Sequence, residues 1–241
     1  NPASVHTYGG VQYLPVQQRF WRHGGSLWSG SGGFGKATWF FDFVTHVWER
    51  KADVDPCYQY GTIPYSAYDS VTGRVFVHRY IRLCEYNPIT NAWVQRGSWD
   101  AGGTPAGTAE IDPVRRKFYL IGGGTVDRYN MLEPGTGKTN KMQLRVVTTG
   151  PQNCVGAAYP GLAYDPVGDR LICWFGGANV YALDLISLVW TEITPTAGNS
   201  VTPTAQPGQG THGRFRYVPG KDVFIAGPNS INGPLYAFRP N

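Results

Sequence analysis

Charged residues are scarce in this sequence, at 15% of 241 positions, where an average domain has about a quarter. A disordered chain would combine high charge with few apolar residues. Here 41% of the residues are hydrophobic and 14% are aromatic, so we expect a packed core. The sequence also lacks an apolar run of membrane-spanning length, which predicts no transmembrane helix and no membrane insertion.

The basic residues are not gathered into a stripe. Lysine and arginine give a net charge of +5 and a pI of about 9.0, but the densest groups are Arg79 with Arg82 and residues 115–117. A nucleic-acid-binding domain usually clusters these residues on one face. We therefore expect a mildly basic solvated surface and no nucleic-acid partner.

The four cysteines, Cys57, Cys84, Cys154 and Cys173, form no CxxC or CxxCH pattern, so we expect no metal and no cofactor. They allow three full pairings, and their spacing does not choose among them. Two alternatives therefore remain. The cysteines could form two disulfides in a secreted protein, or they could be buried free thiols, because Cys84 and Cys173 fall within predicted strands. The chain starts at Asn1 with neither Met nor a signal peptide, so we expect a processed chain or an excised piece.

Two familiar motifs are also missing. No Gly-x-Ser-x-Gly nucleophile elbow occurs. Residues 135–139 (GTGKT) look like the end of a phosphate-binding loop, but Leu132 stands where the first glycine belongs and no helix is expected to follow. We predict that this segment is a hairpin tip between two strands.

The sequence contains a short motif that is repeated five times. In each copy an apolar strand ends, a tight turn follows that often holds Asp-Pro, and a second strand of β-branched and aromatic residues begins. The five copies of the motif are centred on Pro15, Ser70, Pro113, Pro166 and Pro219, which are 55, 43, 53 and 53 residues apart. They predict five β-hairpins with a repeat of about 50 residues.

Two further signatures follow several of the hairpins. Gly-Gly pairs end the second strand at residues 24–25, 122–123 and 176–177, and glycine suits a backbone that leaves a strand with positive φ. Asp or Asn then precedes Trp by six residues, with Thr or Ser between them, in residues 42–48, 87–93 and 184–190. The polar pair predicts a turn, and Trp is expected to open a fourth strand.

These features resemble the kelch family of β-propellers, whose repeats combine a Gly-Gly pair, an aromatic residue before Asp and a Trp six residues later. The resemblance covers residues 6–241. It implies an all-β fold, a propeller of about five four-stranded blades stacked radially so that both faces of each sheet are buried. We place residues 1–241 in a single domain, with blades at residues 6–56, 57–103, 104–153, 154–209 and 210–241.

Three repeats depart from the pattern. Arg79 and Tyr80 replace Gly-Gly in the second, and a longer polar hairpin, residues 133–141, replaces the turn before Trp in the third. The fifth stops at residues 238–241, where its turn and fourth strand should follow, and only five residues precede His6. We therefore expect an incomplete last blade or a chain cut from a larger protein. An unpaired strand edge there would allow self-assembly by strand addition.

A blade of this kind places the strand 2–3 loops and the inter-blade loops on one face. The longest connections fall there, at residues 26–36, 51–63, 97–107, 148–160 and 194–211, and long loops on a rigid scaffold commonly carry binding. The candidate ligand-binding aromatics on this face, which either contact a partner or cover the ends of the core, are Trp28, Phe34, Tyr58, Tyr60 and Trp99. His6 and His212 are expected to begin the first strands of two blades near the channel mouth, as polar residues rather than metal ligands.

Enzymes are also known among kelch-like propellers, and copper radical oxidases such as galactose oxidase are the family to test. Their copper centre needs a Tyr-His ligand pair, and this sequence has no Tyr-His dipeptide, since His6 and Tyr8 stand in the reverse order. A glycosidase needs two facing carboxylates, but five of the 16 acids here occupy repeated turn positions, which favours a structural role for them. They are Asp42, Asp69, Asp112, Asp165 and Asp184.

The leading hypothesis is a non-catalytic recognition or assembly module outside the cell, secreted or on the surface of a cell or virion. It would bind glycan or protein through the loop face. Regular repeats, low charge, many aromatics and missing catalytic motifs favour it. Two alternatives stay open: an oxidase or hydrolase with an unrecognised site, and a structural subunit of a virion, filament or surface assembly.

Overall fold

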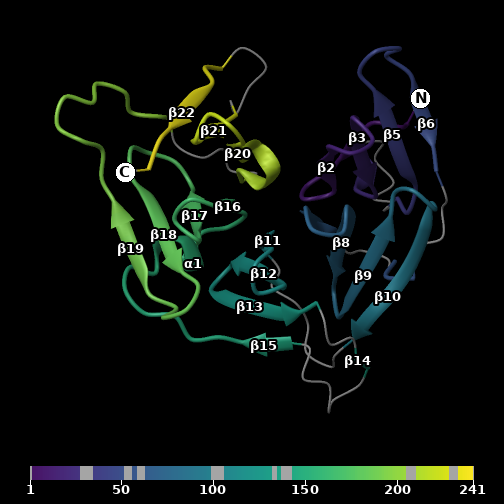
Figure 1. The fold of residues 1–241 in the computed structure, drawn as a ribbon, viewed down its shortest axis with the longest axis horizontal. Coiled ribbons are helices and arrows are strands. Elements are labelled where there is room, and N and C mark those ends of the chain that lie inside the picture. The colour runs from purple at the N-terminus through teal and green to yellow at the C-terminus, as the bar shows by residue number, and fades with distance from the viewer. Residues whose placement is uncertain are drawn as a thin grey trace. The chain divides into compact units, whose positions relative to one another are not determined.

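The computed structural model describes residues 2–27, 35–51, 56–58, 63–98, 106–131, 135–136, 143–204, 210–227 and 233–240. These residues form strands almost throughout, with one short α-helix and one 3-10 turn. Five small sheets built mainly from antiparallel neighbours follow one another along the sequence (Figure 1). The fold class is the one that the repeats predict, an all-β five-bladed propeller.

One compact unit comprises Asn1–Gly103, Pro113–Phe118 and Arg128–Leu144. Its first sheet consists of β2 (Val11–Leu14), β3 (Arg19–His23), β5 (Thr38–Asp42) and β6 (Trp48–Arg50), while β1 (Val5–His6) and β4 (Ser26–Leu27) pair with each other. Its second sheet consists of β7 (Tyr65–Asp69), β8 (Arg74–Arg79), β9 (Arg82–Asn87), β10 (Ala92–Ser98) and β14 (Gly135–Thr136).

The other compact unit comprises Thr104–Asp112, Tyr119–Asp127 and Arg145–Asn241. Its fourth sheet follows α1 (Asn153–Gly156) and consists of β16 (Gly161–Asp165), β17 (Arg170–Trp174), β18 (Val180–Asp184) and β19 (Trp190–Ile193). The fifth sheet follows η1 (His212–Arg214) and consists of β20 (Phe215–Val218), β21 (Val223–Ala226) and β22 (Tyr236–Phe238). Three strands of this sheet lie among the described residues.

The third sheet contributes residues to both units. It consists of β11 (Gly107–Asp112), β12 (Lys117–Gly122), β13 (Thr125–Asn130) and β15 (Gln143–Arg145). A search of the described residues for a helix long and apolar enough to cross a membrane finds none.

The turns between third and fourth strands form as the Asp–Trp signature predicts. Asp42 Oδ1 accepts hydrogen bonds from the backbone N–H groups of Val44 and Thr45, at 2.7 and 3.0 Å, and this local bonding favours the turn. Asn87 and Asp184 accept the corresponding bonds two and three residues ahead. The strand that follows each turn has tryptophan as its first or second residue, as predicted: Trp48, Trp93 and Trp190.

The apolar core lies between consecutive sheets. One cluster joins the first and second sheets and contains Leu14, Trp21, Phe40, Val75, Val77 and Tyr86. Another joins the third and fourth sheets around Trp190, and a further one joins the fourth and fifth sheets around Phe215. Each sheet covers the faces of its neighbours. A sheet that lacks a strand would therefore leave part of the apolar surface between it and its neighbour uncovered.

The four cysteines form two disulfides, Cys57–Cys84 and Cys154–Cys173, with Cα–Cα distances of 5.9 and 6.4 Å. Of the two alternatives that the sequence leaves open, buried free thiols are therefore wrong. Cys84 and Cys173 do lie in strands, β9 and β17, as predicted. The bridges tie these strands to Cys57, outside the sheets, and to Cys154 in α1.

Removal of either disulfide is expected to lower the free energy of unfolding by about 3 kcal/mol, because a crosslink restricts the unfolded chain. The bridges join residues 27 and 19 positions apart, so the two effects should be similar. Urea unfolding of the double variants Cys57→Ser/Cys84→Ser and Cys154→Ser/Cys173→Ser measures each effect. Thiol titration of the denatured, unreduced protein should find no reactive thiol, and a free thiol from every cysteine would contradict both bridges.

The segment predicted as a hairpin tip takes a different role. Gly135 and Thr136 form β14, which runs parallel to β10 and lies opposite Gly97 and Ser98. A parallel edge strand takes its partner from another repeat, so the local motif does not reveal it. The rest of the motif, residues 137–139, lies outside the described residues.

Candidate functional site

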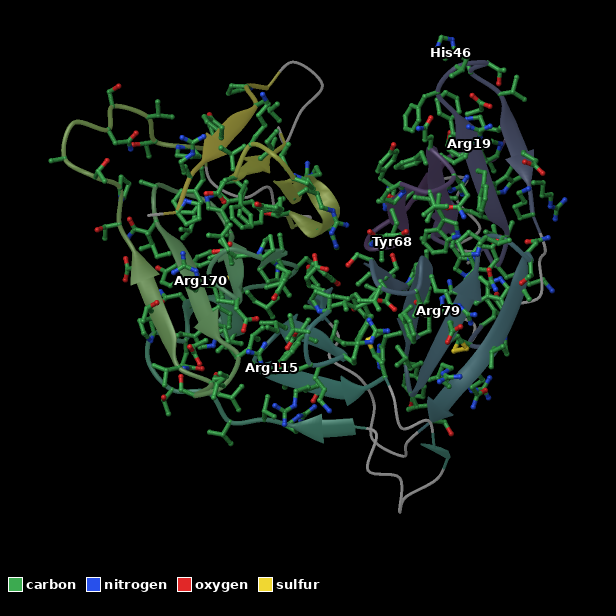
Figure 2. All side chains as sticks on the ribbon, in the orientation of Figure 1. Arg19, His46, Tyr68, Arg79, Arg115 and Arg170 are labelled. Carbon is green, nitrogen blue, oxygen red and sulfur yellow. A yellow bond between two sulfur atoms is a disulfide. The ribbon has the colours of Figure 1, made fainter. Side chains whose placement is uncertain are left out.

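Four of the seven residues predicted to bind a ligand, Trp28, Phe34, Tyr60 and Trp99, lie outside the described residues. The fifth, Tyr58, packs beside the second sheet. The guanidinium of Arg79, buried at the end of β8 (Figure 2), lies 5.3 Å from the centroid of the Tyr58 ring. Tyr58 therefore has a packing contact, and its role in binding stays a prediction.

The two predicted histidines belong to different compact units. His6 lies in β1 opposite Ser26 of β4, with its ring 5.9 Å from that of Tyr8. The prediction that His6 begins a blade's first strand is wrong, because β1 pairs with β4 and the first sheet starts at β2. His212 lies in η1 directly before β20, with its ring 4.5 Å from that of Tyr159. No group of three or more His, Cys, Asp or Glu side chains within the described part of the chain is placed to hold a metal ion.

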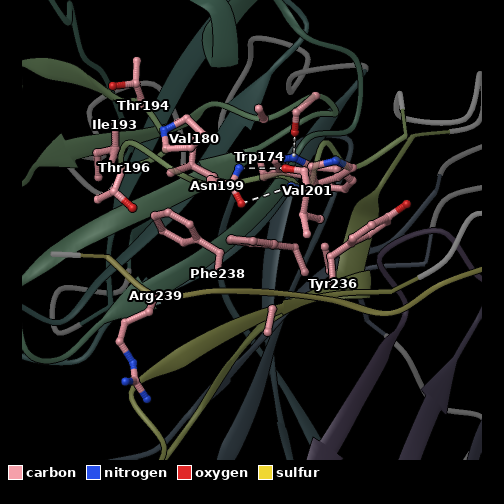
Figure 3. Close-up of a pocket in the computed structure, with 17 residues that line it drawn as sticks. Trp174, Val180, Ile193, Thr194, Thr196, Asn199, Val201, Tyr236, Phe238 and Arg239 are labelled. Atoms are coloured by element: carbon pink, nitrogen blue, oxygen red, sulfur yellow. Dashed lines mark hydrogen bonds between the residues drawn. The ribbon is translucent and has the colours of Figure 1, made fainter.

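A cavity of about 200 Å³ lies between the fourth sheet, the fifth sheet and residues 194–203 (Figure 3). Trp174 and Val180 line it from the fourth sheet, and Phe215 lines it from the fifth. Tyr236 and Phe238 line it from β22, the last strand of the fifth sheet. The cavity therefore lies beside the fifth sheet, and one of the predicted long loops forms one of its walls.

Several aromatic and aliphatic side chains line the cavity. The ring of Phe215 stacks on that of Phe224 at 5.4 Å and lies 6.3 Å from that of Trp174. The Trp174 indole N–H donates to the carbonyl oxygen of Gly177 at 3.0 Å, so this polar group is already bonded. Phe238 is only partly buried against the core between the two sheets. Such a site favours an apolar or aromatic group over a charged one.

Polar residues also line the cavity, among them Thr196, Asn199 and Arg239. Asn199 Nδ2 donates to Val201 O at 2.8 Å, which folds the loop back on itself. Arg239 follows β22, and its guanidinium donates to the carbonyl oxygens of Lys221 and Asp222, at 3.0 and 3.4 Å. Figure 3 shows the side chain of Arg239 pointing away from the other labelled residues. The lining therefore combines apolar side chains with polar groups and one positive charge.

Between the third and fourth sheets, the corresponding position is filled by a tryptophan side chain. Trp190 opens β19, is 1% exposed and packs in the core between the third and fourth sheets. Its indole N–H donates to Thr148 Oγ1 at 3.1 Å, and its backbone N–H donates to Thr149 O at 2.9 Å. Gly150 has a φ of 79°, and a Cβ there would overlap the Trp190 carbonyl oxygen. The segment 148–150 thus holds a tryptophan that opens a fourth strand.

The same short pattern recurs beside the cavity. Thr148 and Gly150 stand three and five residues after the end of β15 at Arg145, and Thr196 and Gly198 stand at the same distances after the end of β19 at Ile193. Gly198 also has positive φ, 91°. No described atom lies within 4 Å of the position that its Cβ would take. We call residues 148–150 and 196–198 the two Thr-x-Gly segments; the first is packed against a strand and the second is not.

The mutation Gly150→Ala is expected to be more destabilising than Gly198→Ala. Left-handed backbone costs a residue with a Cβ about 1–2 kcal/mol, and both variants should show that loss. Only at Gly150 does the new methyl group meet the Trp190 backbone. Urea unfolding of the two variants gives the difference, and equal losses would contradict an open space beside Gly198.

Sequence reasoning missed the cavity and predicted a binding surface from exposed-looking aromatics instead. A signal was present in the matching Thr-x-Gly segments, Thr148 to Gly150 and Thr196 to Gly198. This pattern is too short to predict a site from the sequence. It can be interpreted only in the structure, where a strand packs against the first copy.

No protein-family model matches the sequence, and no curated protein matches it significantly. The resemblance to kelch repeats therefore rests on the residue pattern and stays a prediction.

Proposed function

We propose that this protein is a recognition module that binds a polypeptide through the cavity between its fourth and fifth sheets. The observation that carries the proposal is an aromatic cavity next to β22, a strand with a partner on one side only among the described residues. An edge strand offers backbone hydrogen bonds to an added segment, and an adjacent apolar pocket selects its side chains. Both parts favour a peptide over a small polar ligand.

We further propose that the protein works outside the cell or on a surface exposed to oxidising conditions. The two disulfides support this location, because structural disulfides persist mainly in secreted and surface proteins. Binding of a glycan through Trp28 and Trp99 remains the competing proposal for the ligand.

Two parallel screens test the proposal: a displayed library of random peptides and a glycan array. Both are run on the wild type and on Ala178→Phe, which places a ring at the cavity wall. A matched control is Ala3→Phe, at an exposed position elsewhere. We expect selected peptides to bind the wild type and Ala3→Phe alike, and Ala178→Phe at least tenfold more weakly. The proposal would be overturned if peptides bound Ala178→Phe as tightly as the wild type, or if ligands were found only on the glycan array.

A further inference from the structure

Seven of the described hairpin turns share an exposed aliphatic residue at the same position. It is the second residue after the first or third strand of a sheet, it is Val or Ile in each turn, and it is 62–85% exposed. In chain order these residues are Val16, Val44, Val71, Ile89, Val114, Val167 and Ile186. The same surface chemistry therefore recurs in the first four sheets, whereas the turn between β20 and β21 has Gly220 at this position.

The turn is held by the backbone of this residue. The N–H groups of Val44, Val71 and Ile89 donate to a side-chain oxygen of the Asp or Asn two residues earlier, at 2.7, 3.1 and 3.0 Å. Turns favour Gly, Asn, Asp and Ser, while β-branched residues favour strands. An exposed Val or Ile is thus unfavourable both for the turn and for hydration of the side chain. A contact with another molecule accounts for a residue of this kind at one position of so many turns.

In one compact unit these turns form a surface. Turns after the first and third strands of an antiparallel sheet lie at the same end, about 10 Å apart, because two strand spacings separate them. Core packing joins the first sheet to the second, and the ion pair between Arg116 and Asp69 joins a turn of the third sheet to one of the second. We define the turn surface as the exposed apolar residues of five turns in this unit, Val16, Phe43, Val44, Val47, Val71, Ile89 and Val114.

The turn surface carries little charge. Four of its five turns contain no Asp, Glu, Lys or Arg between their strands, namely residues 15–18, 43–47, 70–73 and 88–91. Charged residues at the strand ends beside these turns are paired. Arg19 Nη2 lies 2.6 Å from Asp42 Oδ2, and Arg116 pairs with Asp69. The centres of protein–protein interfaces are depleted of charge in the same way.

The size of the turn surface suits a protein partner. Burial of one aliphatic side chain removes about 60–120 Å² of apolar surface from water, so seven such side chains offer several hundred square ångström. A standard interface buries about 800 Å² on each partner. The turn surface is therefore large enough to form the apolar centre of one standard interface.

We propose that the turn surface binds a second copy of this chain. A two-fold symmetric dimer pairs the same surface on both subunits, so each copy covers the aliphatic side chains of the other. Two chains with a net charge of +5 can meet at this surface because it brings few like charges together. A partner selected by opposite charge would instead need exposed charges of one sign here. The proposal goes beyond peptide binding at the cavity, whose lining belongs to the other compact unit.

Sedimentation equilibrium of the whole chain, with its disulfides intact, tests the proposal. We expect the average mass to rise from 26.5 kDa towards twice that value as the concentration increases from about 1 μM to about 1 mM. A mass that stays at 26.5 kDa over this range would overturn the proposal, whatever other partner the surface binds.

Charged variants locate the interface. Val71→Asp/Ile89→Asp should raise the dissociation constant of the dimer at least tenfold, because it carries unpaired charges into an apolar contact. Aspartate suits exposed turn positions, and thermal unfolding shows whether the variant keeps its fold. The control, Val147→Asp/Leu235→Asp, adds the same charges at positions outside these turns that are 84% and 62% exposed. It should change the constant less than twofold, and equal effects of the two variants would contradict the proposed interface.

A mixing experiment distinguishes repulsion at the interface from a folding defect. Val71→Lys/Ile89→Lys should be as weakly associated as the aspartate variant when each is measured alone. A one-to-one mixture of the two should associate at least threefold more tightly than either variant, and this gain should disappear in 0.5 M salt. If the mixture associates no better than the separate variants, the turn surface does not pair with itself and the proposal is wrong.

Discussion

Replacement of Asp69 by alanine is expected to lower the free energy of unfolding by about 3–5 kcal/mol, because it removes one partner of a buried ion pair. The Asp69 carboxylate is fully buried and accepts hydrogen bonds from both terminal nitrogens of Arg116, itself only 13% exposed. Thr72 and the backbone N–H of Val71 donate to the same carboxylate. Without Asp69, the largely buried guanidinium of Arg116 loses this ion-pair partner.

Protonation of Asp69 should have a related effect. Burial alone would raise the pKa of this carboxyl, but the hydrogen bonds from Arg116 and Thr72 outweigh burial and hold its pKa below the ordinary value. The unfolded carboxyl titrates near pH 3.9. The ion pair's contribution is therefore present above about pH 4 and is lost as the pH falls through the lower folded pKa.

Urea unfolding at pH 7 and across pH 2–5 tests both statements. The matched control is Asp184→Ala, which removes an exposed aspartate whose carboxylate accepts hydrogen bonds from the backbone N–H groups of its turn. It should lose about 1 kcal/mol. A loss in Asp69→Ala no larger than in Asp184→Ala, or an unchanged acid dependence, would contradict the role given to the ion pair.

Trp190→Ala is the second variant with a large expected effect, about 3–5 kcal/mol. Its side chain fills the core between the third and fourth sheets and is 1% exposed. The cavity left behind is surrounded by strands that are fixed by backbone pairing, so it can collapse only partly. The indole hydrogen bond to Thr148 is lost as well.

The control for this variant is Trp48→Ala, at the same position of the repeat. Trp48 is half-buried and lies against Phe41 and Phe20 of its own sheet, with ring centroids 5.1 and 6.1 Å apart. Because less of its surface is buried, its loss should be about 1–2 kcal/mol. Equal losses in the two variants, measured by urea unfolding, would show that Trp190 does not join consecutive sheets as described.

The sequence predicts the sheets because the chemistry of their turns is local. Asp42, Asn87 and Asp184 bond backbone groups only two and three residues away, so their spacing from tryptophan already encodes the return of the chain.

The candidate site could not be predicted from local sequence patterns, because residues from distant parts of the chain form its walls. Trp174, Thr196, Phe215 and Phe238 meet only after two sheets have packed together. The disulfide pairing also depends on Cα distances that local patterns do not contain. The predicted aromatics of the loop face, Trp28 among them, follow from composition, which carries no information about what each ring contacts.

Hydrogen–deuterium exchange of the chain alone, read on β18 and β22, measures whether the last strand of the fifth sheet has an open edge. We expect strong protection of residues 180–184, which have a strand on each side, and much faster exchange of residues 236–238. Protection of β22 equal to that of β18 would contradict an open edge on the fifth sheet.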